Sequence, residues 1–238
     1  MKVLKGNFGK VYICDCFDGM KKLKDQSIEL CLTDPPYNIG FKGKFSSKRR
    51  QYGEAGGDED KKCYEDSMPN EEYSQFLRDL YHTTIRICQG LILTPGLANL
   101  WEWVKIKEPN YQLRGWFKPL DVCFRNFEPI LMYGKINNIG KWGNTAMVIH
   151  LKTLEKVIHP CPKTYELWFK ILQKINPSSV LDPLVGSGTT AQACEELGIK
   201  YVCFEKNETY IPDIQKRIKL GIKKYGLRSK PKRLMAVR

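Results

Sequence analysis

Residues 180–190 read VLDPLVGSGTT. The apolar pair Val180-Leu181 indicates a buried strand that ends at the acid Asp182, and the glycines that follow indicate a turn before a helix. Glycine lets a ligand approach the backbone closely, because it has no side chain. The full dinucleotide fingerprint G-x-G-x-x-G is absent, so structural glycines at a helix start also explain the stretch. It predicts a strand, a turn and a helix, with a ligand site at the turn.

Apolar runs alternate with helical patterns on both sides of this stretch, which predicts an α/β fold with a mostly parallel sheet. The expected strands are Val11–Cys14, Ile28–Thr33, Gly90–Thr94, Val122–Phe124, Pro129–Tyr133, Ser179–Leu181 and Lys200–Phe204. The expected helices are Phe17–Leu23, Glu71–Cys88 with Asn70 as its cap, Leu97–Ile106, Pro162–Lys174, Gly188–Leu197 and Glu208–Leu220. The polar, glycine-containing segment Phe41–Met68 is expected to be a mobile loop.

A second motif, LTDPPYNIG at residues 32–40, follows another apolar run. Two consecutive prolines end a strand, because proline fixes φ and donates no backbone hydrogen bond. A plain exit from a strand explains an isolated Asp-Pro-Pro. The functional interpretation is that the rigid turn aims Asp34 and Tyr37 into a cleft at the carboxyl end of the sheet, where open α/β sheets bind ligands. Similarly, Glu205 ends the next predicted strand after Asp182 and is placed to bind ribose hydroxyls.

Composition narrows the class of partner. The chain has 238 residues, 42% of them hydrophobic and 27% charged, and a formal net charge of +13, which favours a polyanion. No apolar run is long enough to span a membrane and no signal peptide is evident, so a cytoplasmic protein is expected. The nine cysteines and three histidines show no metal-ligand spacing, and no metal is expected.

The two motifs together resemble those of the S-adenosylmethionine-dependent DNA amino-methyltransferases, the N6-adenine and N4-cytosine family. Asp34-Pro35-Pro36-Tyr37 is similar to the catalytic motif, and residues 182–190 are similar to the cofactor motif, with Leu184 in place of the usual phenylalanine. The similarity extends to residues 126–134 and to His159-Pro160-x-x-Lys163. The order, catalytic motif first, resembles the circularly permuted β group of that family.

The resemblance implies a Rossmann-like class I methyltransferase fold, a circularly permuted, mostly parallel seven-stranded sheet with helices on both faces. One domain would span residues 1–222, with a short candidate target-recognition insert at 136–157 and a basic tail at 223–238. The implied catalytic residues are Asp34, Pro35, Pro36 and Tyr37. The implied cofactor-binding residues are Asp15, Asp34, His159, Lys163, Asp182, Pro183, Leu184, Gly186, Ser187, Gly188, Thr189, Thr190, Glu205 and Lys206. The residues themselves suggest the nucleic-acid contacts: the basic run after the Asp-Pro-Pro-Tyr turn and two residues of the insert, namely Lys42, Lys44, Lys48, Arg49, Arg50, Lys141 and Trp142.

The motif suits the chemistry of an exocyclic amine, whose lone pair is conjugated into the base and is therefore weakly nucleophilic. The Asp34 carboxylate and the Pro35 carbonyl can accept its two N–H bonds, as pre-positioned groups. A base inside a duplex must be flipped out to reach them, and Tyr37 offers a ring for stacking. No metal and no covalent nucleophile is needed.

Several alternatives stay open at this point. Asp at the first motif position favours N6 of adenine, and N4 of cytosine is the alternative. An RNA methyltransferase and a non-catalytic nucleic-acid-binding subunit are lesser ones. Methylation at cytosine C5 needs a cysteine nucleophile, and Cys161, which lies between two prolines, does not suit that role. The implied partner is DNA, with a cognate restriction endonuclease as a further candidate, no membrane, and a monomer or homodimer as the assembly.

Overall fold

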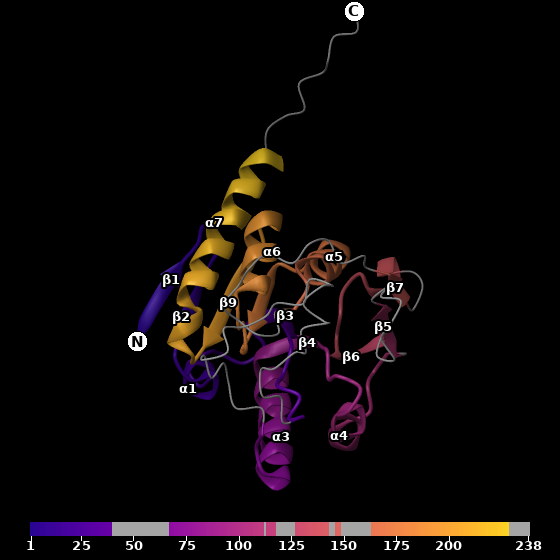
Figure 1. Ribbon diagram of the computed structural model, residues 1–238. Coiled ribbons are helices and arrows are strands. Elements are labelled where there is room, and N and C mark those ends of the chain that lie inside the picture. Colours follow the sequence, from indigo (N-terminus) through magenta and orange to yellow (C-terminus); the bar gives the residue numbers. More distant parts are fainter. Residues whose placement is uncertain (40–66, 112, 118–126, 143–145, 149–162, 229–238) are drawn as a thin grey trace, which may run out of the picture.

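The computed structural model describes residues 1–39, 67–111, 113–117, 127–142, 146–148 and 163–228 (Figure 1). These residues form one sheet with helices on both faces, and most strand pairs are parallel. The strands are β1 (Lys2–Lys5), β2 (Gly9–Ile13), β3 (Ile28–Thr33), β4 (Cys88–Leu93), β5 (Arg114–Phe117), β6 (Phe127–Gly134), β7 (Ala146–Val148), β8 (Ser179–Asp182) and β9 (Lys200–Glu205). The predicted α/β class is confirmed.

The strand order β1-β2-β9-β8-β3-β4-β6-β5-β7 decides where the motifs meet. Strands β8 and β9 come late in the chain, yet they lie between β2 and β3. Strand β3 pairs in parallel with β8, with Leu30 opposite Val180 and Cys31 opposite Leu181. Parallel neighbours end at the same edge of a sheet, so the two motifs, about 150 residues apart in sequence, emerge side by side.

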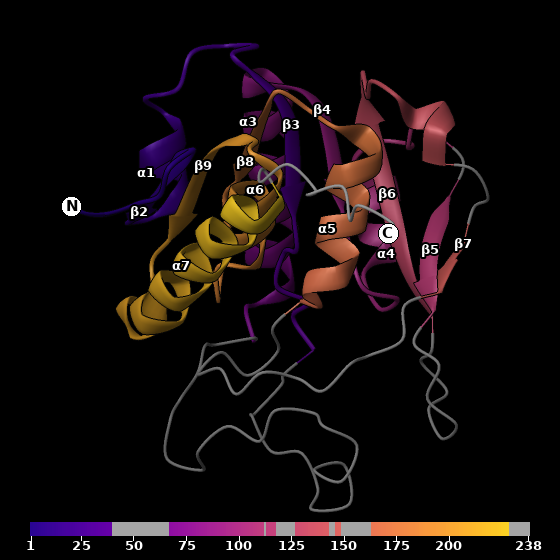
Figure 2. The same cartoon turned by 90° about the horizontal axis from the view of Figure 1, so that it is seen from above.

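Two hydrophobic cores, one on each face of the sheet, hold the layers together (Figure 2). Leu30 and Leu32 of β3 belong to the core under α5, α6 and α7, whereas Cys31 between them belongs to the core under α1, α3 and α4. This alternation is the period-two pattern of a strand. It explains why the strand reads as a continuous apolar run, since both of its faces are covered.

The helices follow the predicted pattern closely. They are α1 (Cys16–Met20), α3 (Asn70–Ile87), α4 (Leu100–Ile106), α5 (Tyr165–Ile175), α6 (Thr189–Leu197) and α7 (Ile211–Arg228), with short 3-10 helices at Ile139–Trp142 and Glu208–Tyr210. Asn70 is the first residue of α3 rather than its cap, which is Pro69 without a side-chain hydrogen bond. Helix α7 extends past residue 222 and so includes the first residues of the segment assigned to the basic tail.

The described part of the sheet has nine strands, not the seven expected. Three short strands, β1, β5 and β7, were not predicted, and β1 and β7 form the two edges. The hydrophobic pattern of strand β1 is too short to predict a strand. The hairpin that β1 forms with β2 is stabilised by contacts with α6. The amides of Asn7 and Phe8 donate to the buried Glu195 carboxylate of α6, at 3.2 and 3.1 Å. The predicted strand Val122–Phe124 and most of the predicted loop lie outside the described residues.

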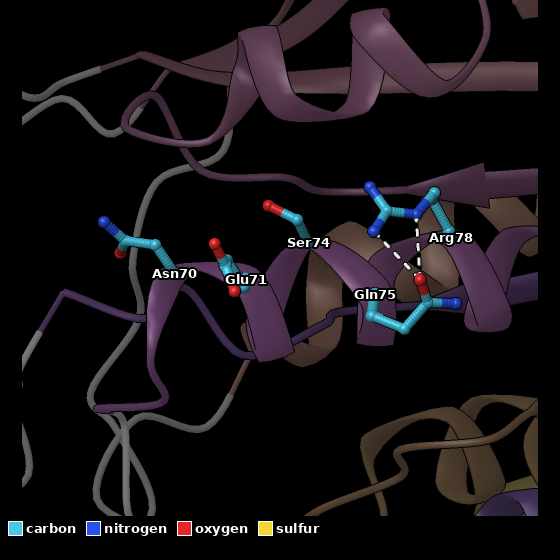
Figure 3. A pocket seen from close by; sticks show the side chains of 5 residues that line it. All are labelled: Asn70, Glu71, Ser74, Gln75 and Arg78. Carbon is cyan, nitrogen blue, oxygen red and sulfur yellow. Dashed lines mark hydrogen bonds between the residues drawn. The ribbon is translucent and has the colours of Figure 1, made fainter.

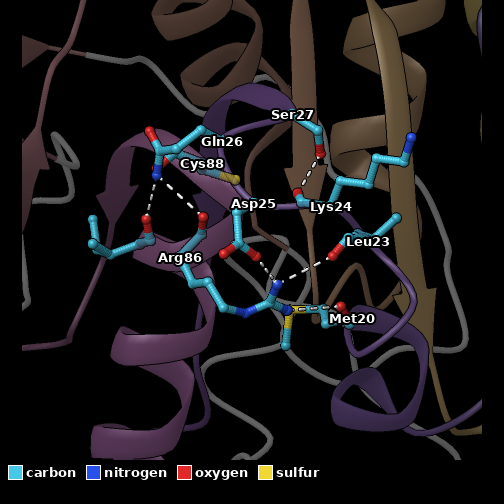
Figure 4. Close-up of polar contacts among 9 residues, drawn as sticks. Met20, Leu23, Lys24, Asp25, Gln26, Ser27, Arg86 and Cys88 are labelled. Carbon is cyan, nitrogen blue, oxygen red and sulfur yellow. Dashed lines mark hydrogen bonds and ion pairs between the residues drawn. The ribbon is translucent and has the colours of Figure 1, made fainter.

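A polar junction joins the α1–β3 connection to the end of α3 (Figure 4). Arg86 pairs with Asp25 and donates to the carbonyls of Met20 and Leu23, each at 3.1 Å. Gln26, at a φ of 49°, donates to the carbonyl of Ile85 at 2.8 Å. These contacts precede β3 and β4, so they lie at the opposite end of the strands from the two motifs and fix the strand starts.

Among the described residues, no helix combines the length and the apolar character that crossing a membrane requires. The same part of the chain contains no group of three or more His, Cys, Asp or Glu side chains arranged to hold a metal ion.

Candidate active site

The two motifs are joined directly by a side-chain hydrogen bond. Thr33, the last residue of β3, donates from Oγ1 to Oδ1 of Asp182, the last residue of β8, at 2.9 Å. Both side chains are buried. The Asp-Pro-Pro-Tyr turn and the glycine turn therefore begin from one fixed point at the carboxyl edge of the sheet.

Asp34 is held by three donors that all reach the same oxygen. Its Oδ1 accepts from Tyr37 Oη at 3.0 Å and from Thr94 Oγ1 at 2.5 Å, and it pairs with Lys163 Nζ at 3.0 Å. The other oxygen, Oδ2, has no hydrogen-bond partner among the described residues. The Asp34 side chain is 24% exposed. The carboxylate is thus oriented through Oδ1, and Oδ2 keeps its capacity to accept.

Lys163 lies at the centre of this polar cluster. Its Nζ also donates to Glu128 Oε2 at 3.1 Å and to Tyr37 Oη at 2.8 Å, and its side chain is 9% exposed. Burial alone would lower the pKa of Lys163, but the Asp34 and Glu128 carboxylates outweigh it and hold that pKa well above its usual value. Burial raises the pKa of Asp34, while Lys163 opposes that rise.

The turn that carries Asp34 is fixed by its surroundings. Tyr73 Oη of α3 donates to the Pro36 carbonyl at 2.8 Å, and Asn99 Nδ2 donates to the Tyr37 carbonyl. A Cβ at Gly96, where φ is 68°, would lie 3.0 Å from the Tyr37 ring, so glycine permits this close approach. No donor among the described residues reaches the Pro35 carbonyl, which leaves that oxygen available as an acceptor.

Asp182 differs from Asp34 in having both oxygens occupied by the protein. Oδ1 accepts from Thr33 and from the Leu184 amide at 3.0 Å, and Oδ2 accepts from Thr190 Oγ1 at 2.5 Å. The residue is 2% exposed. Burial raises its pKa to about 6, against the effect of these three donors, and the nearby Asp34 adds to the rise. Asp182 holds the turn in shape.

The glycine turn is closed by Glu205 at the end of β9. Glu205 Oε2 accepts from the Gly186 amide at 3.0 Å, and Oε1 accepts from the Asn207 amide at 2.7 Å. Burial raises the pKa of Glu205 to about 7, although both amides oppose the rise. Gly186 and Gly188 have φ values of 53° and 91°, which favour glycine. The glycine at 188 also has a packing role, because a Cβ there would lie 3.0 Å from the Ile214 backbone.

The remaining predicted cofactor residues surround this turn, with different exposures. Pro183, Ser187, Thr189 and Thr190 are buried, Leu184 is partly buried, and Lys206 is exposed. Thr189 Oγ1 donates to the Lys163 carbonyl at 3.3 Å, which connects the turn to the cluster around Asp34. Asp15, at the end of β2, is exposed and caps α1 by accepting from the Phe17 amide at 2.8 Å.

Some predicted residues cannot be placed. His159, Lys42, Lys44, Lys48, Arg49 and Arg50 lie outside the described residues, as do the side chains of Lys141 and Trp142. Conversely, the sequence analysis assigned no role to Thr94 or Glu128. Thr94 directly follows β4, whose parallel pairing with β3 brings it to the end of β3, and the antiparallel pairing of β6 with β4 brings Glu128 to the same edge. No local pattern signals that proximity.

A shallow hollow of about 480 Å³ lies elsewhere, along the exposed side of α3 (Figure 3). Its lining comes from one face of one helix, and Arg78 donates within it to Gln75 Oε1 at 2.9 Å. No described residue of another element lines it, so it carries no functional assignment.

Comparison with known proteins finds a similarity to one family of enzymes. The family model described as DNA methylase, of the N6/N4 type, matches residues 142–216, which include the glycine turn, Asp182 and Glu205. Over these residues the chain is similar to the N6/N4 DNA methylases. The resemblance drawn from the motifs is therefore confirmed.

Relatives along the whole length agree with this family. The type II methyltransferase M.HpaI of Haemophilus parainfluenzae is 26% identical over 87% of this chain and 73% of its own. The type II methyltransferase M2.LlaDCHI of Lactococcus lactis subsp. cremoris is 25% identical over 90% of both chains.

Solved structures of similar fold include the cytosine-N4-specific PvuII DNA methyltransferase, with a TM-score of 0.67, 13% identity and 93% coverage of each chain. Another is M1.HpyAVI in complex with SAM, with a TM-score of 0.59, 18% identity, and coverage of 88% of this chain and 99% of that one. These likenesses concern the fold.

Proposed function

We propose that this chain is a DNA amino-methyltransferase that uses S-adenosylmethionine and methylates N6 of an adenine flipped out of the duplex. The single observation that carries the proposal is the Thr33–Asp182 hydrogen bond, which joins the Asp-Pro-Pro-Tyr turn to the glycine turn. A group that binds amines and a turn suited to a nucleoside ligand thereby share one edge of the sheet.

The residues at the glycine turn fit this cofactor in their chemistry. Glu205 and Asp15 supply carboxylates at the ends of β9 and β2, and the amides of the glycine turn lie beside Glu205. Glu205 would hold the ribose hydroxyls by exchanging one of its present amide partners. When bound, S-adenosylmethionine supplies an electrophilic methyl group on a sulfonium.

The turn at Asp34 raises the nucleophilicity of the target nitrogen. Asp34 Oδ2 and the Pro35 carbonyl are the two acceptors that the described protein leaves open, and an exocyclic amine has two N–H bonds to donate. Accepting both bonds withdraws the lone pair from conjugation with the ring. Because the carboxylate is already fixed through Oδ1, little reorganisation accompanies this step. The ring of Tyr37 is proposed as the stacking surface for the base.

The base itself is tested by one experiment. The protein is incubated with methyl-labelled cofactor and DNA of mixed sequence, and the DNA is digested to nucleosides and separated. Label in N6-methyldeoxyadenosine supports the proposal, and label in N4-methyldeoxycytidine supports the alternative amino-methyltransferase. Label in neither, by a folded protein that binds the cofactor, would contradict the function. Parallel reactions on RNA test the remaining enzymatic alternative.

A further inference from the structure

We propose that Lys163 and Glu128 are positioning residues for methyl transfer: Lys163 keeps the Asp34 carboxylate ionised and oriented, and Glu128 holds Lys163 in place. This inference rests on the proposed function and deepens it. It assigns Lys163 to the target-amine side of the site, whereas the sequence resemblance implied a contact with the cofactor.

The Lys163 ammonium contacts three oxygens of the cluster around Asp34. Its ammonium lies 3.0 Å from Asp34 Oδ1, 2.8 Å from Tyr37 Oη and 3.1 Å from Glu128 Oε2. The three oxygens match the three donors of an ammonium. In the described structure, the three ammonium donors of Lys163 are therefore all used within the cluster around Asp34.

The Lys163–Glu128 ion pair is largely buried. The side chains of Lys163 and Glu128 are 9% and 14% exposed, and a charge removed from water needs a partner. Glu128 is on β6 and Lys163 just precedes α5, so the pair joins two elements to the turn after β3. Without Glu128, the ammonium would lose one of the contacts that fix it beside Asp34.

The charged groups around Asp34 act on its ionisation in opposite directions. Within the described part of the chain, the titratable groups that act on Asp34 are Lys163, Glu128, Tyr37 from its own turn, and Asp182 at the end of β8. Tyr37 stays neutral, because burial and Asp34 raise its pKa well above the usual value. Lys163 therefore favours the ionised form of Asp34, and Glu128 disfavours it.

These opposite influences make the inference testable through the acid limb of the pH profile. Accepting an N–H bond requires ionised Asp34, so the rate of transfer should fall as the pH drops through the pKa of Asp34. Lys163→Gln should move that limb to higher pH and lower the rate at neutral pH by ~10-fold or more. Glu128→Gln, which removes the negative charge but keeps an amide oxygen that can accept from Lys163, should move the limb to lower pH. Lys163→Arg, which keeps the charge, should leave the limb in place even if its rate falls.

The experiment measures single-turnover methyl transfer to DNA from pH 5 to 9, at saturating cofactor, for the full chain and each variant. Lys170→Gln and Glu72→Gln, which change exposed residues, are the matched controls. Thermal unfolding and cofactor affinity are recorded for every protein. If a glutamine variant does not fold, Lys163→Met and Glu128→Ala, which also remove the charges, test the same two shifts of the limb.

The outcomes separate this inference from the proposed function. Opposite shifts of the acid limb for Lys163→Gln and Glu128→Gln support the inference. Limbs that stay in place, or shift in the same direction, in an active enzyme overturn it alone. Weaker cofactor binding by Lys163→Gln with an unmoved limb would overturn it and return Lys163 to the cofactor side. A wild-type protein that transfers no methyl group to DNA would overturn the proposed function, and this inference with it.

Discussion

Asp34 directly follows β3 and Asp182 is the last residue of the neighbouring parallel strand β8, and each is followed by proline. Their surroundings differ. Asp182 is almost completely buried and gives both oxygens to donors within the protein, whereas Asp34 gives one oxygen to three donors and keeps the other. The same local sequence thus builds a structural acid at one strand and an acid suited to a ligand at the other. The tertiary donors, and not the motif, decide which is which.

The largest effect is expected from Asp34→Ala. Loss of the acceptor that acts on the target amine should reduce methyl transfer by ~10²–10³-fold or more, as for other pre-positioned electrostatic groups. Cofactor affinity by calorimetry should stay within about two-fold of wild type. A parallel loss of both properties would move Asp34 to the cofactor pocket.

Asp182→Ala should act mainly on stability. The change leaves the Thr33 and Thr190 hydroxyls and the Leu184 amide without their acceptor in a buried place. The expected cost is about 2–4 kcal/mol of the free energy of unfolding, measured by chemical denaturation. Asp18→Ala, which alters an exposed acid of α1, is the control. An unchanged unfolding midpoint for Asp182→Ala would contradict the structural role.

The buried carboxyls of Asp182 and Glu205 also predict that the stability of the folded protein depends on pH. The folded-state pKa values of Asp182 and Glu205 are raised to about 6 and about 7, above the value of about 4 for an unfolded carboxyl. The folded protein therefore binds more protons than the unfolded chain between pH 4 and 7, and ionisation of these two groups lowers stability as the pH rises through that window. The double variant Asp182→Asn with Glu205→Gln should lose less stability than wild type between pH 5 and 7. Parallel curves in thermal unfolding would count against the raised values.

Glu205→Ala is expected to weaken cofactor binding by ~10-fold or more, from the loss of a charged hydrogen bond of about 1.5–3 kcal/mol. The variant also removes the acceptor of the Gly186 amide, so the glycine turn loses a support. Calorimetry with S-adenosylmethionine measures the change. A folded variant with unchanged affinity would rule out the proposed ribose contact.

The smallest effect concerns the basic C-terminal tail. Truncation after Leu227 removes Arg228, Lys230, Lys232, Arg233 and Arg238. If these residues contact phosphates, affinity should fall similarly on all DNA sequences, and each lost contact should make the slope of log affinity against log salt shallower by about 0.9. The methylated base should not change, because base choice is expected to be set at Asp34 and Tyr37. Equal slopes for full-length and truncated protein would show that the tail does not contribute.

The sequence predicted the fold class and the two turns because each is encoded locally. An apolar run followed by prolines ends a strand, and glycines after an acid make a turn before a helix. The short strands β1, β5 and β7 escaped prediction because tertiary pairing, and not a long apolar run, defines them.

The polar partners of Asp34 and Glu205 were not predicted either, because tertiary contacts bring them together. Thr94 and Glu128 meet Asp34 only through strand pairing. Likewise, the Gly186 amide reaches Glu205 only because β8 and β9 are neighbours in the sheet. The sequence therefore indicated Asp34 as a candidate but not the cluster that holds it.

The central claim, that Asp34 presents Oδ2 to the target amine while its Oδ1 is held by the protein, is tested most directly by Asp34→Asn. The amide keeps an oxygen for Tyr37, Thr94 and Lys163 but places a donor where Oδ2 accepts. Single-turnover transfer of labelled methyl to DNA, at saturating cofactor, is the measurement. The account predicts a loss of ~10²-fold or more with unchanged thermal stability and cofactor affinity. Transfer at the wild-type rate would contradict it.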